Sequence, residues 1–147
     1  MRAPFQILVI PYRSIGIARE FAVLKRSDDG SWQFVSGGGE DEETPVQAAG
    51  REVLEETGFE SDSPLIALDS MSSIPKNCFA AAESWGAGVF VVPEHCFAVN
   101  VGNSKLVLSK EHIDLRWLPY AQASELLKWD SNQTALWELN ERLKLSN

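Results

Sequence analysis

Carboxylate side chains recur at helical spacing in the segment Arg51-Glu52-Val53-Leu54-Glu55-Glu56-Thr57-Gly58-Phe59. On a helix, Glu52 lies three residues from Glu55 and four residues from Glu56, so the three carboxylates share one face. Like charges at this spacing destabilise a bare helix by roughly 0.2–0.5 kcal/mol per pair, which a bound cation would offset. Mg²⁺ is the natural candidate because it prefers oxygen ligands and keeps waters and substrate phosphates in its shell.

Three glycines, Gly37-Gly38-Gly39, precede this segment and are followed by Glu40-Asp41-Glu42-Glu43. Backbone without side chains approaches other groups closely, so we expect the carbonyl of Gly37 to complete the metal shell. Arg51 can pair with Glu55 one turn on, or with Glu43, and so fix the geometry of the carboxylates. We interpret residues 40–42 as a solvated turn.

The caps of a helix flank the acidic segment. Thr44 is a good N-cap, Pro45 suits the first helical position, and Gln47 completes a capping box. Gly58 stands where a helix ends in a left-handed residue. Three apolar residues recur at i, i+3 and i+7 and predict the buried side of this helix: Val46, Ala49 and Val53.

Together these residues match the template G-x5-E-x7-R-E-U-x-E-E-x-G-U, where U is a bulky apolar residue, and every fixed position is filled. This is the signature of the Nudix hydrolases, and the chain resembles that family. Phe59 departs slightly, since the family usually has an aliphatic residue there. The resemblance implies an α/β/α sandwich with a mixed β-sheet, and an enzyme that cleaves phosphoanhydrides with divalent cations.

The run Trp32-Gln33-Phe34-Val35-Ser36-Gly37 narrows the resemblance. It is similar to the W-Q-x-V-T-G segment that precedes the motif in bacterial Nudix enzymes that act on dATP or dihydroneopterin triphosphate. This implies hydrolysis of such a triphosphate to pyrophosphate and a monophosphate. Ser36 replaces the threonine of that pattern, and residues 72–82 show no clear match.

The resemblance assigns roles to several residues. Glu52 and Glu56 match the metal ligands, and Glu111 matches a late carboxylate that approaches the metal and can act as base. The sequence does not decide whether Glu55 or Glu111 is the general base. Mg²⁺ is the implied cofactor, with Mn²⁺ as a substitute, and Arg51 completes the catalytic set.

Three further residues match positions that contact substrate in the subgroup: Arg2, Lys25 and Ser36. We interpret the five tryptophans as core anchors, and if one of them stacks on a purine or pterin ring, Trp85 or Trp32 is our choice. We assign no role to His112.

Two alternatives stay open. Pro75 lies 16 residues after Phe59, close to where a proline marks many ADP-ribose pyrophosphatases. A non-catalytic Nudix-fold nucleotide sensor is the alternative of another class, but such modules commonly lose the carboxylates that this chain keeps.

The elements that position these residues alternate along the chain and suggest an α/β sandwich. The strands we expect are Phe5–Tyr12, Phe21–Lys25, Trp32–Val35, Leu65–Met71, Trp85–Val92 ending at Pro93, Leu106–Leu108 and Ile113–Leu118. Two helices should follow, one over Ala121–Lys128 and one beginning near Ser131 or Asn132.

Size and charge agree with a small enzyme. The 147 residues suggest one domain over residues 1–147. A net charge of −8 argues against binding to long nucleic acids. Ile7–Ile10 is too short for a signal peptide, and no stretch reaches the ~20 apolar residues of a membrane span. We therefore expect a cytoplasmic protein with two free thiols, Cys78 and Cys96, although one disulfide, and the choice between monomer and homodimer, stay open.

Overall fold

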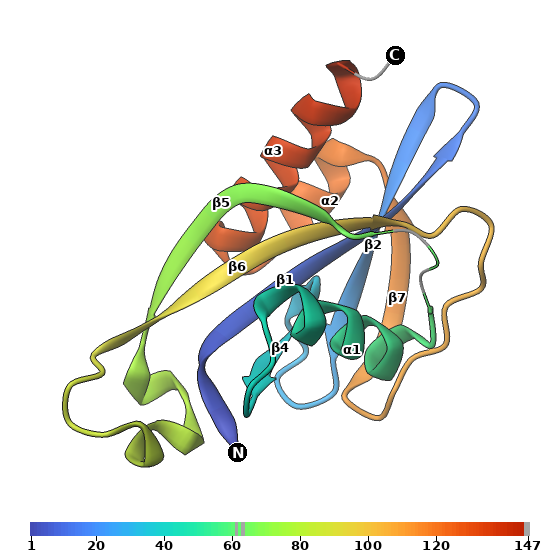
Figure 1. Ribbon diagram of the computed structural model, residues 1–147. Coiled ribbons are helices and arrows are strands. Elements are labelled where there is room, and N and C mark those ends of the chain that lie inside the picture. The colour runs from blue at the N-terminus through green and yellow to red at the C-terminus, as the bar shows by residue number, and fades with distance from the viewer. Residues whose placement is uncertain (61, 63, 146–147) are drawn as a thin grey trace.

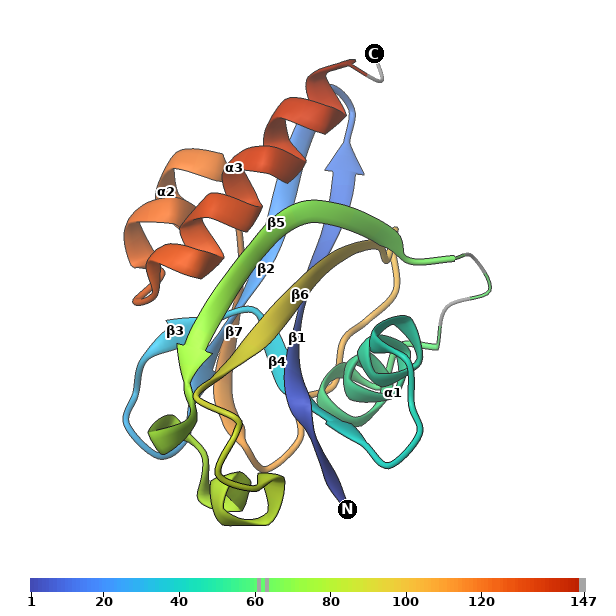
Figure 2. The same cartoon turned by 60° about the vertical axis from the view of Figure 1, so that its left-hand side comes forward.

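The computed structural model describes residues 1–60, 62 and 64–145. Within this part of the chain, a mixed seven-stranded sheet lies between helix α1 (Pro45–Thr57) on one face and helices α2 (Tyr120–Leu126) and α3 (Asp130–Leu145) on the other (Figures 1 and 2). This is the expected α/β/α sandwich. No helix of the described residues combines the length and apolar character that crossing a membrane requires.

Most strands are longer than the sequence predicted, whereas the expected strand at Trp32–Val35 divides between two strands, one ending at Gln33 and the next beginning at Val35. The strands are β1 (Arg2–Ile15), β2 (Ala18–Arg26), β3 (Trp32–Gln33), β4 (Val35–Glu40), β5 (Ile66–Pro75), β6 (Val91–Asn100) and β7 (His112–Leu118). Two short 3₁₀ segments, η1 (Lys76–Cys78) and η2 (Ala80–Trp85), connect β5 to β6.

Strand β1 organises the sheet. The order is β3-β2-β1-β6-β5, with β4 paired to β1 and β7 paired to β2. β1 runs parallel to β6 and antiparallel to β2 and β4. Because β1 pairs with both β4 and β6, the glycine strand and the middle of β6 lie on either side of the same residues of β1.

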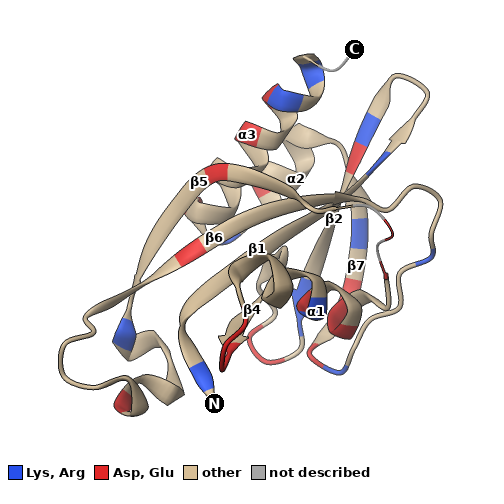
Figure 3. Cartoon of the chain, in the orientation of Figure 1, with Lys and Arg blue, Asp and Glu red and all other residues tan. Residues whose placement is uncertain are grey.

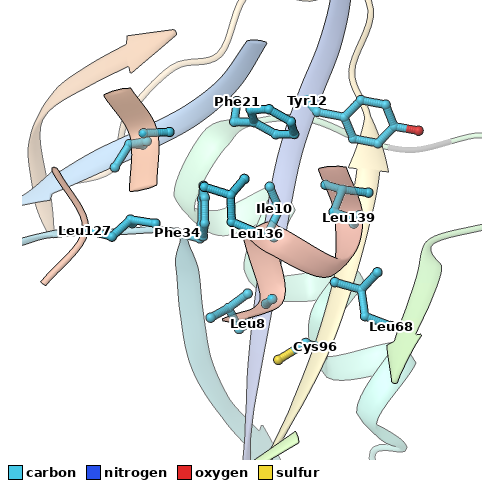
Figure 4. Close-up of a cluster of buried hydrophobic side chains, with 14 of the residues drawn as sticks. Leu8, Ile10, Tyr12, Phe21, Phe34, Leu68, Cys96, Leu127, Leu136 and Leu139 are labelled. Atoms are coloured by element: carbon cyan, nitrogen blue, oxygen red, sulfur yellow. The ribbon is translucent and has the colours of Figure 1, made fainter. Parts of the chain in front are cut away.

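The alternation of side chains along β1 builds two cores, one on each face of the sheet. Ile7 and Val9 pack with Ala49 and Val53 of α1. Leu8 and Ile10 pack on the opposite face with residues of α2 and α3, among them Leu136 (Figure 4). Both faces of the central strand are therefore buried, which fixes the register of the strands that carry polar residues toward the site.

Helix α1 has the predicted caps. Thr44 Oγ1 accepts from the backbone N–H of Gln47 at 3.3 Å, Gln47 Oε1 accepts from that of Thr44 at 2.9 Å, and Gly58 adopts φ 72°. The expected apolar stripe is partly wrong, because Val46 is 48% exposed. The buried positions of the helix are instead 48, 49, 53, 56 and 57, so its contact face includes one of the acidic residues.

The expected strand at Trp85–Val92 is wrong. Residue 85 ends η2, and β6 starts at Val91 and continues through Pro93 to Asn100. Proline is tolerated there because the pairing of β6 with β1 begins at Glu94, so the missing N–H of Pro93 lies outside that ladder.

The expected strand at Leu106–Leu108 is also wrong. These residues form a loop whose Val107 N–H donates to the carbonyl of Thr57 at 2.8 Å. Leu106 and Leu108 pack against the core beneath α1. Their apolar character anchors the loop to the end of α1, and the loop leads to Glu111.

Candidate active site

The three glycines of β4 each make room for a side chain from elsewhere. A Cβ atom at Gly37 would collide with the carboxyl group of Glu52, one at Gly38 with the guanidinium of Arg2, and one at Gly39 with the ring of Phe5. Glycine is therefore required for close approach here. The strand brings its backbone directly against the acidic face of α1.

Arg51 connects the strand, the turn and the helix. Its guanidinium donates to both carboxylate oxygens of Glu43 at 2.8 and 3.0 Å and to the carbonyl of Gly38 at 2.8 Å. It also donates to Glu52 at 3.0 Å and to Glu55 at 3.3 Å. The hydrogen bonds from Arg51 hold the pKa of Glu43 below its usual range. One arginine thus orients the carboxylates, as the sequence suggested.

Acidic residues lie on the β4–α1 turn and on α1 (Figure 3). Their side chains differ sharply in burial. Glu56 is 2% exposed, and neither of its carboxyl oxygens has a hydrogen-bond partner among the described residues. Glu55 is 57% exposed. Burial, and then the neighbouring Glu52, raise the pKa of Glu56 well above its usual range, and burial also raises the pKa of Glu52. Two ionised carboxyl groups that are shielded from water destabilise the fold unless a cation compensates their charge.

A divalent cation fits this donor set. The orphaned oxygens of Glu56, the adjacent Glu52 and the bare backbone of Gly37 converge from two elements. Nowhere in the described part of the chain do three His, Cys, Asp or Glu side chains gather around one point. Two carboxylates suit Mg²⁺, which usually binds through one or two carboxylates and keeps waters and substrate phosphates as its other ligands.

His112 lies behind the carboxylates. Its Nε2 is 3.6 Å from Glu56 Oε1, and both side chains are buried. Burial lowers the pKa of His112 and so favours the neutral imidazole. We assign no role to this histidine from the sequence, in which only its position next to Glu111 indicates a place near the site.

A cavity of about 690 Å³ opens beside the glycine strand. Its walls come from β1, β4, β5, β6, the turn after β2 and the start of α3. The polar residues that line it include Arg2, Gln6, Arg26, Gln33, Ser36, Glu94, Glu111 and Asn132, together with Gly37 and Gly38. Because Gly37 touches both the cavity and Glu52, a ligand in this cavity would lie next to the carboxylates.

The structure brings three of the six proposed substrate and catalytic residues to this cavity, whereas Lys25, Arg51 and Glu55 do not line it. Arg2, Ser36 and Glu111 line it. Arg2 is fixed by hydrogen bonds to Phe5 O at 2.8 Å and Gln6 Oε1 at 2.7 Å. Ser36 Oγ accepts from Gln6 Nε2 at 2.8 Å.

Lys25 lies elsewhere. Among the described residues, the cavity is lined by the next residue, Arg26, and not by Lys25, whose ammonium lies 5.9 Å from the centre of the Trp32 ring. Alternation along β2 explains the difference, because neighbouring residues of a strand point to opposite faces. The sequence could not show which of two adjacent basic residues faces the cavity.

The two tryptophans chosen for ring stacking are engaged with arginines. Trp85 Nε1 donates to the carbonyl of Arg2 at 2.8 Å, and the Arg2 guanidinium lies 5.7 Å from its ring. Trp32 packs against Arg116 at 4.7 Å. Phe79 and Trp129 are the aromatic residues that line the cavity.

The NUDIX domain model matches residues 8–137, and the chain therefore belongs to the Nudix family. It is a Nudix pyrophosphohydrolase, and the family generally uses divalent metal ions and acts on small nucleotide-like substrates.

Three comparisons describe its relatives. A Nudix hydrolase from Listeria monocytogenes is 46% identical, with a TM-score of 0.88 over 98% of this chain and 97% of that one. The structure of the Escherichia coli dihydroneopterin triphosphate pyrophosphohydrolase has a TM-score of 0.75 and 30% identity, covering 95% and 97% of the two chains. The dihydroneopterin triphosphate diphosphatase of Haemophilus influenzae is 30% identical over 78% of this chain and 74% of its own length.

Proposed function

We propose that this enzyme hydrolyses dihydroneopterin triphosphate, or a nucleoside triphosphate such as dATP, to pyrophosphate and the monophosphate. The observation that supports this proposal most directly is the contact between Gly37 and Glu52, which places a cavity of about 690 Å³ next to the partly buried Glu52 and the buried Glu56. A cavity of this size lies within the range of small-molecule sites. The similarity to two dihydroneopterin triphosphate hydrolases supports the choice of substrate.

Glu52 and Glu56 are the residues we propose to hold Mg²⁺ or Mn²⁺, with the carbonyl of Gly37 beside them. The bound ion would polarise the phosphates and lower the pKa of a bound water. Arg51 keeps Glu52 in place through the 3.0 Å hydrogen bond between them. The buried His112 lies beside Glu56, with its Nε2 atom 3.6 Å from Glu56 Oε1.

Glu111 is our candidate for the general base. It lines the cavity, whereas Glu55 does not line it and accepts a hydrogen bond from Arg51 at 3.3 Å. A base must reach the proton of the attacking water, and a cavity-lining carboxylate is better situated to do so. Glu55 stays the alternative.

The basic and hydroxyl residues of the cavity wall are suited to bind the phosphates. Arg2 and Arg26 supply guanidinium groups, which bind phosphate in bidentate fashion, and Ser36 supplies a hydroxyl. These two cations stand among the carboxylates of Asp28, Glu94, Glu111 and Asp130 in the same wall, and Arg26 donates to Asp28 Oδ1 at 2.8 Å.

ADP-ribose is the second candidate, because Pro75 lines the same cavity. A screen of dihydroneopterin triphosphate, dATP and ADP-ribose with Mg²⁺ separates the two. Our proposal expects pyrophosphate from the triphosphates. Efficient release of AMP and ribose 5-phosphate from ADP-ribose, with negligible pyrophosphate from the triphosphates, would refute it.

A further inference from the structure

Glu94 contributes a buried carboxyl group to the wall of the cavity. In the sequence it is far from the proposed metal-binding residues. It lies on β6 and is 4% exposed. Its register partners are Gln6 on β1 and Ser72 on β5, and all three residues line the cavity. Glu94 therefore belongs to the part of the cavity wall that the sheet forms, flanked by polar residues on both neighbouring strands.

The amide side chains around Glu94 are already hydrogen-bonded within the protein. Gln6 accepts from Arg2 at 2.7 Å and donates to Ser36 at 2.8 Å. Asn132 accepts from the backbone N–H of Phe34 at 3.0 Å. These hydrogen bonds hold the two amide groups in position.

Glu94 differs from them. Its Oε1 is buried and has no hydrogen-bond partner in the described part of the chain. Burial raises the pKa of Glu94, and the side chain of Ser131 partly opposes this shift. A buried acceptor without a donor is costly, so a ligand that brings N–H groups would recover that cost.

We propose that Glu94 selects the heterocycle of the substrate by accepting hydrogen bonds from a ring N–H and its adjacent amino group. Guanine and the pterins share this 2-amino-oxopyrimidine edge. Adenine would instead place a ring nitrogen lone pair toward the ionised carboxylate, which has no proton to offer, so of the two substrates proposed above the inference favours the pterin over dATP. The inference rests on the proposed function, in which the ring of the triphosphate occupies this cavity.

Binding of the product-like monophosphates tests the proposal without catalysis. dGMP, dIMP and dAMP share a sugar and a phosphate, and dIMP differs from dGMP only by the missing amino group. Calorimetry should give an affinity for dGMP at least about 10-fold above that for dIMP, the scale expected when a buried charged group loses a donor. The affinity for neopterin monophosphate is measured in parallel. Comparing it with the affinity for dGMP shows which of the two rings with this edge binds more tightly.

Glu94→Gln keeps the volume of the side chain and exchanges one acceptor for a donor. The preference for dGMP over dIMP should then fall to within about 2-fold, while the melting temperature stays near that of the wild type. Glu125→Gln, the same change at an exposed residue of α2, should keep the wild-type preference. If Glu94 has only a structural role, Glu94→Gln should instead lower the affinities for dGMP and dIMP by the same factor.

The outcomes are separable. If dGMP and neopterin monophosphate both bind no more tightly than dIMP to the wild type, or if the preference survives in Glu94→Gln, the proposal is overturned. A wild-type ratio near one overturns the proposal even if the variant fails to fold. A preference for dGMP that the wild type shows and Glu94→Gln loses, without release of pyrophosphate from any triphosphate, would remove the proposed function and leave the role of Glu94 standing.

Discussion

Gly37 of β4 lies against the carboxyl group of Glu52 of α1, leaving no room for a Cβ atom between them. The strand backbone and the acidic helix face are therefore in van der Waals contact. Any side chain at residue 37 must displace either the carboxylate or the strand.

Gly37→Ala should lower kcat/KM by about 100-fold, because a displacement of about 1 Å at a catalytic group costs on this order. Gly50→Ala is the matched control. A Cβ at Gly50, in the same helix, meets nothing within 4 Å outside the helix backbone. That variant should keep its activity and gain about 0.5–1 kcal/mol of stability. Unchanged kinetics of a folded Gly37→Ala protein would contradict the close contact.

Glu56→Gln should fold and lose at least about 100-fold in turnover, the scale of lost metal-ion catalysis. The variant keeps the volume of a side chain that is 2% exposed and removes its charge. Steady-state kinetics with Mg²⁺, together with a thermal melt, provide the measurement. Wild-type turnover in a correctly folded Glu56→Gln protein would exclude this residue as a ligand.

Metal binding should stabilise the fold. An ion that binds only the folded state adds about 2.7 kcal/mol at 100 times its Kd. The melting temperature should rise with Mg²⁺ or Mn²⁺ in the wild type, and rise less in Glu52→Gln. An equal rise in both proteins would locate the ion elsewhere.

The rise in melting temperature on metal binding should depend on pH. The pKa values of Glu52 and Glu56 are raised by burial, so protons compete with the ion for these carboxylates as the pH falls. In the metal-free protein, the stability that comes from protonated Glu56 is present below its unfolded pKa and is lost as pH rises through the folded value. The metal-induced shift in melting temperature should therefore be larger at pH 8 than at pH 5.

The catalytic helix was predictable in detail because its determinants are local. Thr44, Gln47 and Gly58 act on backbone groups within one turn, and the spacing of the glutamates follows from the sequence. The rotation of α1 about its axis against the sheet could not be predicted from the sequence. This rotation buries Glu56 and exposes Glu55.

The cavity was less predictable, since its walls come from segments far apart in the chain. Glu94 and Arg26 carried no motif, and their place depends on the register of β6 and β2. The strand expected at Trp85–Val92 is wrong at both ends: its start lies in η2, and Pro93 does not stop β6 because this residue pairs with β5 alone.

Arg26→Ala and Lys25→Ala should behave differently. Arg26 lines the cavity, and Lys25 lies over Trp32. We expect KM for the triphosphate to rise about 10-fold in Arg26→Ala, on the scale of one lost charge-assisted hydrogen bond, and to change less than about 2-fold in Lys25→Ala. The reverse result would assign the phosphate contact to Lys25, as the family resemblance implies.

Glu138 of α3 ties the helix to β5, whose far end forms a wall of the cavity. Its carboxylate accepts from the backbone N–H groups of Asp69 at 2.8 Å and Ser70 at 2.7 Å, from Ser70 Oγ at 2.6 Å and from Arg142 at 2.7 Å. Burial opposes ionisation, but these hydrogen bonds outweigh it and lower the pKa of Glu138 from 4.5 to about 2.

Glu138→Gln should therefore destabilise the protein by about 1–3 kcal/mol at pH 7, since hydrogen bonds to a charged group are lost. A depressed folded pKa adds stability above the unfolded value of 4.5, and this stability disappears as pH falls toward about 2. The difference in unfolding free energy between wild type and variant, measured by urea titration, should shrink over that interval. Glu141→Gln, which removes an exposed pair with Lys144, should change stability by less than about 0.5 kcal/mol at either pH. A loss in Glu138→Gln of equal size at pH 7 and pH 3 would mean that packing, rather than the charge of Glu138, joins α3 to β5.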